Sequence, residues 1–423
     1  MQKKIIEYFN QITEIPHCSK KTDGLLKFLK EFGLSRGYSV EIDGAKNILI
    51  KKGKPKLALQ AHYDMVCIGK APKIETYIDN GWLKAKESSL GADNGIAIAI
   101  MMALIDMGKE LEFLFTSDEE IGLIGASALN FELDSSSMLN IDFEDEAEVC
   151  IGCAGGADVI ATFKLQERGE LKYNYRVTVS GLQGGHSGLD IDKNIPNAIK
   201  LLVEYLKDKD VALSTFNGGE RRNSIPTYAK ATLSSLDVLK GNDIVKVEPL
   251  DDNLLVYESD KVINLLTEFK NGIHSYNREL NIPEKSVNLA IINLNNGFIS
   301  IEVSTRAMSQ IGIDEICKES IEFFKRYGFI VEEEYKYPAW RPEINSFTKK
   351  VYRCVESVFG KSEYRAIHAG LECGIISQRY PNIQIASIGP TISNPHSIRE
   401  KVKIDSIEKI VRVILTLLSE YKK

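Results

Sequence analysis

The sequence lacks any apolar run long enough to cross a lipid bilayer. The longest run extends from Ile96 to Ile105, whereas a membrane-spanning helix needs about 20 apolar residues. The first residues, Met1-Gln-Lys-Lys-Ile-Ile-Glu7, lack the apolar core and small-residue cleavage site of a signal peptide. We therefore expect a cytoplasmic protein with no membrane partner.

Basic residues are too few and too dispersed to indicate a nucleic-acid partner. The chain has 53 Lys and Arg against 59 Asp and Glu, which gives a net charge of -6, and no basic stripe is present. Proteins that bind nucleic acids meet the phosphate backbone with clustered Lys and Arg. The composition therefore argues against nucleic acid as a partner.

Cysteine is also sparse. The seven cysteines are odd in number and scattered, which suits reduced thiols better than a disulfide framework. Cys150-Ile-Gly-Cys153 has C-x-x-C spacing, but no second pair follows at zinc-ribbon spacing and a glycine-rich turn comes next. A structural zinc site or a redox role at this pair is the less favoured interpretation.

The length and the apolar pattern indicate two domains built from helices and strands. A chain of 423 residues exceeds what one hydrophobic core usually serves. Apolar residues at helical spacing predict helices over 2–14, 24–35, 96–105, 122–128, 196–206, 260–271 and 314–327. Short β-rich runs predict strands over 39–42, 48–51, 82–85, 111–116, 138–142, 173–179, 212–216, 228–236, 287–294, 298–304 and 329–335.

In the stretch from Leu57 to Val66, His62 and Asp64 lie where the apolar run ends. Such a run is typical of a buried central strand, and side chains two apart on a strand share a face. Both side chains therefore point the same way at the carboxyl end of the strand, where open α/β sheets bind ligands. This stretch alone leaves open a core histidine beside a solvated aspartate.

Further acidic residues follow other predicted elements. Asp93 lies in a small-residue turn directly before the 96–105 helix, so helix capping is the alternative to a functional role. The strand at 111–116 ends in Asp118, Glu119 and Glu120. Neighbouring acids at a buried strand end repel one another and need a compensating cation, although a solvated acidic turn would also fit.

Together these patterns predict a metal centre. A third strand ends at Asp142, and a turn-rich loop far downstream presents His396. The predicted cluster comprises His62, Asp93, Glu120, Asp142 and His396. Imidazoles combined with carboxylates suit Zn²⁺, Mn²⁺ or Co²⁺. These ligands exceed what one tetrahedral ion uses, so two metal ions that share a carboxylate are the simplest arrangement.

The motifs resemble a known enzyme family along the whole chain. They are Gln60 to Val66, Leu90 to Gly95, Asp118 to Gly122, Asn140 to Asp142, Gly152 to Gly156, Gly184 to Gly188, Phe216 to Gly219, Arg222 to Pro226, His368 to Gly374, Gly389 to Thr391 and Pro395 to Ser397. The chain resembles the M20 family of co-catalytic metallopeptidases, and within it the PepD-type aminoacyl-histidine (Xaa-His) dipeptidases. The resemblance implies an α/β fold, in which a mixed-sheet, zinc-peptidase-like catalytic domain (1–165 and 339–423) carries an inserted α+β lid domain (166–338).

The resemblance also implies roles for the clustered residues. Asp93 would bridge two divalent metal ions, expected to be Zn²⁺ with Mn²⁺ or Co²⁺ as alternatives. His62 and Asp142 would complete one ion's ligands, and Glu120 and His396 the other's. Asp64 would accept the N–H of His62. Glu119 would be the general base that takes a proton from water and returns it to the leaving amine.

Other implied roles fall in the lid and near the second catalytic segment. His186 would stabilise the oxyanion, while Asn223 and Arg306 would hold the substrate carbonyl and C-terminal carboxylate. Gly370 would offer backbone contacts. A surface salt bridge is the alternative for Arg306. His368 and Glu372 are expected to support their loop without binding metal.

The predicted activity is hydrolysis of small peptides. The expected substrates are dipeptides with a free C-terminal carboxylate, such as the Xaa-His dipeptide carnosine. An M20-type aminoacylase, another small-amide hydrolase and a non-catalytic metal-binding scaffold are the alternatives. Glu119 argues against the scaffold, because a pure metal binder needs no acid beside its ligands. The sequence leaves open whether the lid forms a homodimer.

Overall fold

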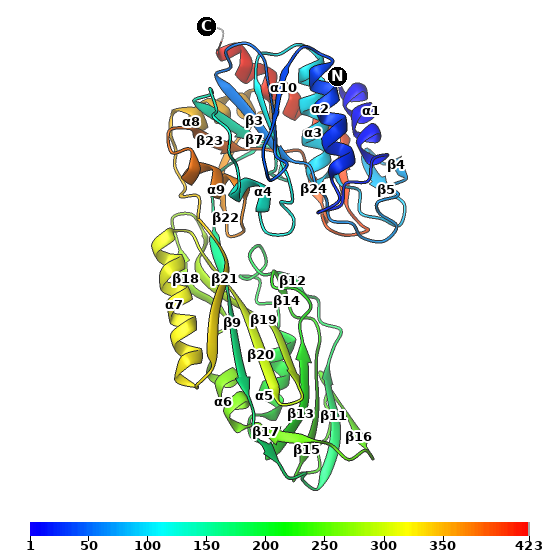
Figure 1. Cartoon of the computed structure of the whole chain (residues 1–423), viewed down its shortest axis with the longest axis vertical. Coiled ribbons are helices and arrows are strands. Elements are labelled where there is room, and N and C mark those ends of the chain that lie inside the picture. Colours follow the sequence, from blue (N-terminus) through cyan, green and yellow to red (C-terminus); the bar gives the residue numbers. More distant parts are fainter. Residues whose placement is uncertain (422–423) are drawn as a thin grey trace. The chain divides into compact units, whose positions relative to one another are not determined.

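The computed structural model describes residues 1–421 and divides the chain into two compact units (Figure 1). Unit 1 combines Met1–Gly152, Trp340–Ala366 and the described residues from Leu371 onward, while unit 2 combines Cys153–Ala339 and Ile367–Gly370. Within residues 1–421, no helix has both the length and the apolar character needed to span a membrane. Each unit has its own hydrophobic core.

Unit 1 is built on a mixed sheet of eight strands in the order β1-β2-β6-β3-β7-β23-β8-β22. Its strands are β1 (Ser39–Ile42), β2 (Ile48–Lys51), β3 (Leu57–His62), β6 (Glu112–Thr116), β7 (Ser137–Asn140), β8 (Glu148–Cys153), β22 (Glu363–Ile367) and β23 (Gln384–Ser387). Strand β3 runs parallel to both β6 and β7. A smaller sheet contains β4 (Thr76–Asp79), β5 (Trp82–Ala85), β24 (Ile392–Ser393) and β25 (Lys401–Lys403).

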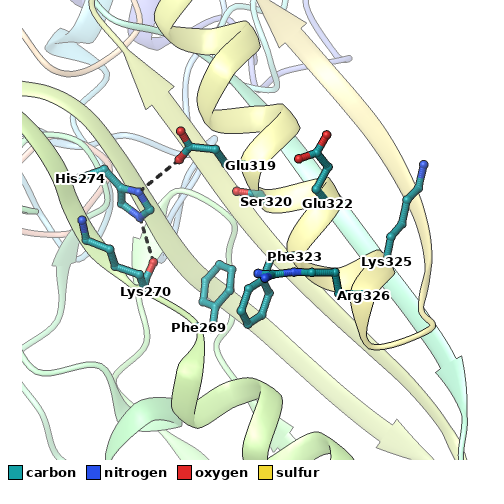
Figure 2. A pocket seen from close by; sticks show the side chains of 9 residues that line it. All are labelled: Phe269, Lys270, His274, Glu319, Ser320, Glu322, Phe323, Lys325 and Arg326. Atoms are coloured by element: carbon teal, nitrogen blue, oxygen red, sulfur yellow. Dashed lines mark hydrogen bonds and ion pairs between the residues drawn. The ribbon is translucent and has the colours of Figure 1, made fainter.

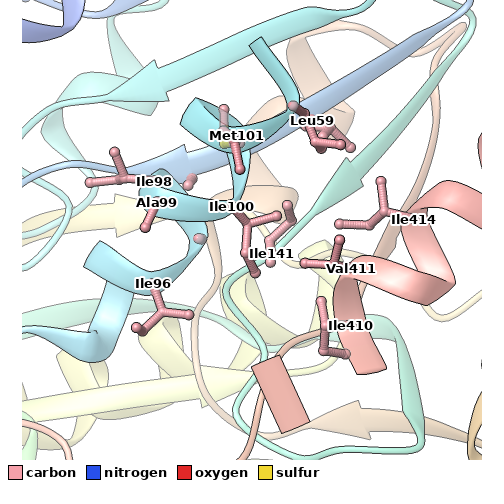
Figure 3. Packing of buried hydrophobic residues seen from close by; sticks show 14 of the residues in the cluster. Leu59, Ile96, Ile98, Ala99, Ile100, Met101, Ile141, Ile410, Val411 and Ile414 are labelled. Atoms are coloured by element: carbon pink, nitrogen blue, oxygen red, sulfur yellow. The ribbon is translucent and has the colours of Figure 1, made fainter. Parts of the chain in front are cut away.

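Helices complete the core of unit 1. They are α1 (Gln2–Thr13), α2 (Asp23–Leu34), α3 (Ala92–Asp106), α4 (Ile124–Ser127), α8 (Ser346–Phe359), α9 (Glu372–Arg379) and α10 (Ile404–Glu420). Helix α3 is buried along nearly its whole length. Figure 3 shows Ile100 of α3, Leu59 of β3, Ile141 and aliphatic side chains of α10, which all belong to one buried cluster. Burial of each such side chain stabilises the fold by about 1.5–3 kcal/mol, which holds the ends of β3 and α3 in fixed positions.

Unit 2 is an antiparallel sheet covered by helices. Its main strands are β9 (Gly155–Lys164), β11 (Tyr173–Val179), β13 (Val211–Gly218), β15 (Ala229–Ser235), β16 (Val245–Leu250), β19 (Ile282–Asn295), β20 (Phe298–Ala307) and β21 (Ile330–Tyr337). The shorter strands β10 (Glu167–Arg168), β17 (Val256–Glu258) and β18 (Gly272–Asn277) join this sheet, whereas β12 (Gly185–His186) and β14 (Ser224–Ile225) pair as a separate two-stranded sheet. Helices α5 (Ala198–Leu206), α6 (Asp260–Glu268) and α7 (Gln310–Arg326) contribute to one core with the main sheet.

The structure confirms the α/β class and most predicted elements, with two local differences. The predicted helix over 122–128 is only the short α4, because Gly122 and Leu123 take positive φ angles. Residues 153–165, which the sequence assigned to the catalytic domain, lie in unit 2. The reason is that β9 pairs with β20 and β21, and this pairing is invisible in the local apolar pattern.

The expectation that all cysteines are reduced is wrong for one pair. Cys18 and Cys67 form a disulfide across 49 residues of sequence. The remaining five cysteines are buried, and neither Cys150 nor Cys153 belongs to a candidate metal-binding group within residues 1–421. The pairing was missed because cysteines far apart in sequence give no local signal of their contact.

Candidate metal centre and substrate-binding residues

The predicted metal ligands of unit 1 converge at one edge of its large sheet. His62 is the last residue of β3, and Glu120 and Asp142 follow the ends of β6 and β7. Because β6 and β7 both run parallel to β3, the carboxyl ends of all three strands lie at the same edge of the sheet. Asp93 joins them from the start of α3, and His396 joins them from the loop after β24.

Asp93 lies at the centre of the cluster. Its Oδ1 is 3.1 Å from Nε2 of His62, and its Oδ2 is 3.0 Å from Nε2 of His396. Helix capping alone does not explain the position of Asp93, since both of its carboxylate oxygens contact histidine rings. One carboxylate therefore faces both histidines, as a bridging ligand must.

Two further carboxylates complete the cluster. Asp142 Oδ1 is 3.4 Å from His62 Nε2, and Glu120 Oε2 is 2.9 Å from His396 Nε2. Potential ligand atoms of His62, Asp93 and Asp142 all lie within 4.8 Å of one another, as do those of Asp93, Glu120 and His396. Both of these sets contain Asp93, as the sharing of one aspartate by two ions requires, whereas a third such set, His62, Glu119 and Glu120, does not contain it.

The charges and the hydrogen bonding of the cluster fit divalent cations. Asp142 Oδ1 and Glu120 Oε1 are buried and have no hydrogen-bond partner among the described residues. Buried carboxylate oxygens without partners are costly unless a cation compensates them. The donor set of imidazole nitrogens and carboxylate oxygens suits Zn²⁺, Mn²⁺ or Co²⁺.

Mutual interactions shift the pKa values of these groups. Burial acts to raise the pKa of Asp93, but hydrogen bonds with His396 and His62 hold it well below its usual range. Burial acts to lower the pKa of His396, yet the carboxylates of Asp93 and Glu120 raise it to about 12. Burial raises the pKa of Glu119 well above its ordinary value, with help from Glu120. A carboxyl whose pKa is raised in this way is suited to accept a proton.

Asp64 has contacts beyond the one expected with His62. Nδ1 of His62 is 3.0 Å from the backbone carbonyl of Asp64 and 3.6 Å from its carboxylate. The carboxylate also accepts hydrogen bonds from the backbone N–H groups of Glu119 at 2.9 Å and Glu120 at 3.3 Å, and from the hydroxyl of Ser19 at 2.7 Å. Asp64 thus fixes the segment that carries both glutamates, in addition to orienting His62 through its backbone.

The predicted oxyanion residue His186 lies in unit 2, in β12. Its Nδ1 accepts the backbone N–H groups of Gly188 at 3.2 Å and Leu189 at 3.0 Å. An acceptor Nδ1 in a neutral imidazole requires the proton on Nε2. His186 therefore presents Nε2 as a hydrogen-bond donor.

Arg306, in β20 of unit 2, is a buried cation with incomplete pairing. Its side chain donates to the Tyr337 hydroxyl at 2.8 Å and the Ser187 hydroxyl at 3.4 Å. Within residues 1–421 it forms no ion pair, and its Nε has no hydrogen-bond partner. The alternative of a surface salt bridge is therefore wrong. A buried guanidinium that lacks a carboxylate is suited to bind an anion.

The other predicted lid residues also lie in unit 2. Asn223 is exposed, and its backbone carbonyl accepts the N–H of Ser187 at 2.8 Å. Gly370 lies close to Tyr337, because an added Cβ would come within 2.9 Å of that ring. His368 contacts the Ser286 hydroxyl through Nε2 at 2.7 Å. Burial and the charge of Arg306 lower the pKa of His368 to about 3.

Glu372, in unit 1, behaves as a supporting residue. Its buried carboxylate accepts hydrogen bonds from Gln60 at 2.5 Å and Thr116 at 2.6 Å, which lie on β3 and β6. It belongs to no candidate metal group within residues 1–421. The carboxylate therefore ties together the two strands that end in His62 and the paired glutamates.

A separate pocket of about 730 Å³ lies in unit 2 beside α7 (Figure 2). It is lined by Phe269, Lys270, His274, Glu319, Ser320, Glu322, Phe323, Lys325 and Arg326. None of these is a predicted site residue. His274, to which the sequence gave no role, contacts the carbonyl of Lys270 through Nε2 at 3.0 Å.

Sequence reasoning missed contacts that organise the metal cluster. Ser19 and Glu400 were assigned no role, yet Ser19 binds Asp64 and Glu400 binds the turn that carries Asp93. The only available signal for Glu400 was its position four residues after His396. An acid in such a loop resembles an ordinary surface residue.

Comparison with known proteins agrees with this geometry. The sequence profile of "Peptidase family M20/M25/M40" matches residues 58–420. The cytosol non-specific dipeptidase of Escherichia coli (strain K12) is 33% identical over 469 aligned residues, which cover 98% of this chain and 96% of that protein. The chain therefore belongs to the M20/M25/M40 peptidase family. It is a metallopeptidase of the M20 type.

Solved structures support the same assignment. The aminoacylhistidine dipeptidase from Vibrio alginolyticus matches with a TM-score of 0.79 and 30% identity, covering 99% of this chain and 96% of that one. Human carnosine dipeptidase 1 matches with a TM-score of 0.59 over 98% of this chain and 96% of that one. At 11% identity, this second likeness shows the fold alone.

Proposed function

We propose that the protein hydrolyses dipeptides that have a free C-terminal carboxylate, using two divalent metal ions. The observation that carries this proposal is the position of Asp93 between His62 and His396, with one carboxylate oxygen facing each ring. His62 and Asp142 would hold one ion, and Glu120 and His396 would hold the other. Zn²⁺ is the proposed ion, with Mn²⁺ and Co²⁺ as the alternatives to compare.

Glu119 is the proposed general base. When bound, the ions would activate a water molecule and polarise the scissile carbonyl. Glu119 takes a proton from the attacking water and returns it to the amine as the peptide bond breaks. Its raised pKa and the hydrogen bond from its backbone N–H to Asp64 support this role. Its neighbour Glu120 contacts His396 and is the ligand of the pair.

Residues of unit 2 are proposed to bind the substrate. His186 donates from Nε2 to the oxygen of the scissile carbonyl as negative charge develops there. Arg306 binds the C-terminal carboxylate, in keeping with its buried, incompletely paired guanidinium. Asn223 contacts the substrate carbonyl, and Gly370 offers its backbone. These assignments favour a substrate with a free carboxylate over a larger or amidated peptide.

A preference for Xaa-His dipeptides is the finer proposal. The Vibrio relative is named an aminoacylhistidine dipeptidase, whereas the Escherichia coli relative is named a non-specific dipeptidase. The two names give different expectations for the range of substrates. We favour Xaa-His substrates such as carnosine, with a cytoplasmic location like the one named for the Escherichia coli relative.

The test is a metal-reconstitution assay with a substrate panel. The purified protein is stripped with a chelator, reloaded with Zn²⁺, Mn²⁺ or Co²⁺, and assayed with Xaa-His dipeptides, other dipeptides, dipeptide amides and N-acetyl amino acids. We expect metal-dependent cleavage of the free dipeptides, fastest for Xaa-His. Faster cleavage of N-acetyl amino acids would favour an aminoacylase. Metal binding without turnover of any compound would favour the non-catalytic scaffold.

A further inference from the structure

Glu400 is a buried carboxylate directed at the turn that carries Asp93. Oε2 accepts the backbone N–H groups of Leu90 at 2.7 Å and Gly91 at 3.0 Å, while Oε1 accepts those of Ala92 at 2.8 Å and Asp93 at 3.3 Å. The residue is only 3% exposed. Both carboxylate oxygens are thus used, each by a pair of consecutive N–H groups.

This arrangement exceeds an ordinary helix cap. Within residues 1–421 Glu400 forms no ion pair, so its negative charge is compensated by the N–H groups and the positive end of the α3 dipole. A buried acid beside another acid is retained at a cost, which points to a role beyond stabilising the helix.

Glu400 also lies in the same loop as His396, four residues further along the chain. Its hydrogen bonds therefore connect the segment of one proposed ligand to the segment of another, although the two segments are 310 residues apart at Leu90. The side chain of His396 is 39% exposed, so burial alone does not fix its position. The loop thus needs an anchor that fixes His396 relative to Asp93.

We propose that Glu400 is a positioning residue that sets the separation of Asp93 and His396, and so the affinity of the metal site formed by Asp93, Glu120 and His396. The inference rests on the proposed two-metal function and deepens it. Removing the anchor leaves every ligand side chain present but lets the segments that carry Asp93 and His396 move apart. Contacts of this kind, outside the ligand set, typically change metal affinity by about 10- to 100-fold.

The decisive variant is Glu400→Gln, which preserves size but replaces one acceptor oxygen with an amide NH₂ group. That group faces two N–H donors, so half of the anchor is lost. Glu112→Gln is the matched control. Glu112 is also fully buried and accepts two backbone N–H groups, from Asp134 at 2.8 Å and Ser135 at 2.9 Å, but it lies at the opposite end of β6 from the metal cluster.

The experiment measures Zn²⁺ binding to the full chain by calorimetry and the visible spectrum of the Co²⁺ form. We expect Glu400→Gln to weaken one of two binding events by about 10- to 100-fold, alter the Co²⁺ spectrum of that site, and recover activity at high Zn²⁺. Glu112→Gln should leave both binding events unchanged. In a His396→Ala background, Glu400→Gln should add little further loss, because the residue it positions is already absent.

Unchanged Zn²⁺ affinities in a folded Glu400→Gln protein would overturn the proposal and leave Glu400 as a helix cap. If Glu400→Gln does not fold, Glu400→Asp takes its place, since it keeps both oxygens but shortens the anchor by one methylene group. The Zn²⁺ affinities of Glu400→Asp and the wild type are then compared, and unchanged affinities would again overturn the proposal. Failure of the wild-type protein to bind two ions would instead contradict the proposed function, so the two failures are distinguishable.

Discussion

The carboxylate of Asp64 accepts the backbone N–H of Glu119 at 2.9 Å. The same carboxylate accepts the N–H of Glu120 and the hydroxyl of Ser19. The proposed base and the neighbouring metal ligand are therefore placed by one buried side chain. Because Asp64 lies two residues after the end of β3, the position of the base is tied to that of His62, the last residue of this strand.

Replacing Asp64 should impair catalysis more than metal binding. In Asp64→Ala, the segment that carries Glu119 loses its hydrogen-bond acceptor, so we expect kcat to fall by about 10- to 100-fold while two ions remain bound at saturating metal. Steady-state kinetics and elemental analysis measure the two effects. Asp118→Asn is the control, because within residues 1–421 the side chain of Asp118 accepts a hydrogen bond only from the backbone N–H of Lys20. Equal losses in both variants would contradict a role specific to Asp64.

Substitution of Glu119 should impair catalysis, whereas substitution of Asp93 should impair metal binding. Glu119→Gln should keep its metal but lower kcat by about 10²- to 10⁴-fold, the usual contribution of a general base. Asp93→Ala should lower the metal content, since both proposed sites lose a ligand. Retained turnover in Glu119→Gln would remove this residue from the base role, and two tightly bound ions in Asp93→Ala would contradict a bridging carboxylate.

Arg306 should discriminate substrates by their C-terminal group. A hydrogen bond to a charged group contributes about 1.5–3 kcal/mol, so Arg306→Gln should lower kcat/KM for a dipeptide by about 10- to 100-fold. The matching dipeptide amide lacks the carboxylate and should be affected much less. Measuring kcat/KM for the dipeptide and its amide with the wild type and with Arg306→Gln gives the interaction energy between Arg306 and the substrate carboxylate. An equal loss for the amide would assign Arg306 a structural role.

His368 should make the stability of the protein depend on pH. Its pKa is lowered to about 3 by burial and by the charge of Arg306, whereas an unfolded histidine titrates near pH 6.5. The unfolded state therefore binds the extra proton between these values, and the free energy of unfolding falls as pH decreases below about 6.5, by up to about 1.4 kcal/mol per pH unit.

Denaturant unfolding of the metal-free protein between pH 5 and 7 tests this expectation. His368→Asn removes the titrating group, so its unfolding free energy should change less with pH than that of the wild type. All other titrating groups are common to both proteins and cancel in the difference. Parallel curves would mean that His368 is not held in its neutral form.

The disulfide between Cys18 and Cys67 should be detectable by counting thiols. Closing a loop of this length stabilises a fold by about 2–4 kcal/mol, so reduction or Cys18→Ser should lower the unfolding temperature. In denaturant, a thiol reagent should titrate five cysteines before reduction and all seven after it. Seven reactive thiols in freshly purified protein would show that the bond does not persist, as expected of most cytoplasmic proteins.

Much of the catalytic unit could be predicted because its signals are local. The apolar run before His62 identified β3, and the runs before Glu119 and Asp142 identified β6 and β7. Parallel strands place their carboxyl ends at one edge, so the ligands could be grouped before the structure was known. The second unit was harder to delimit, because β9 belongs to it only through pairing with β20 and β21.

The amino-acid sequence by itself determined which side chains stand at the strand ends and therefore which metal chemistry the chain can support. Periodicity and strand termination depend on neighbouring residues, so they can be recognised along the chain. Only the tertiary structure decided that Asp64 accepts a hydrogen bond from the backbone of Glu119, that Cys18 forms a disulfide with Cys67, and that Glu400 accepts hydrogen bonds from the turn at the start of α3. These contacts join residues distant in sequence, and they depend on how loops close across the packed core, which no local pattern specifies.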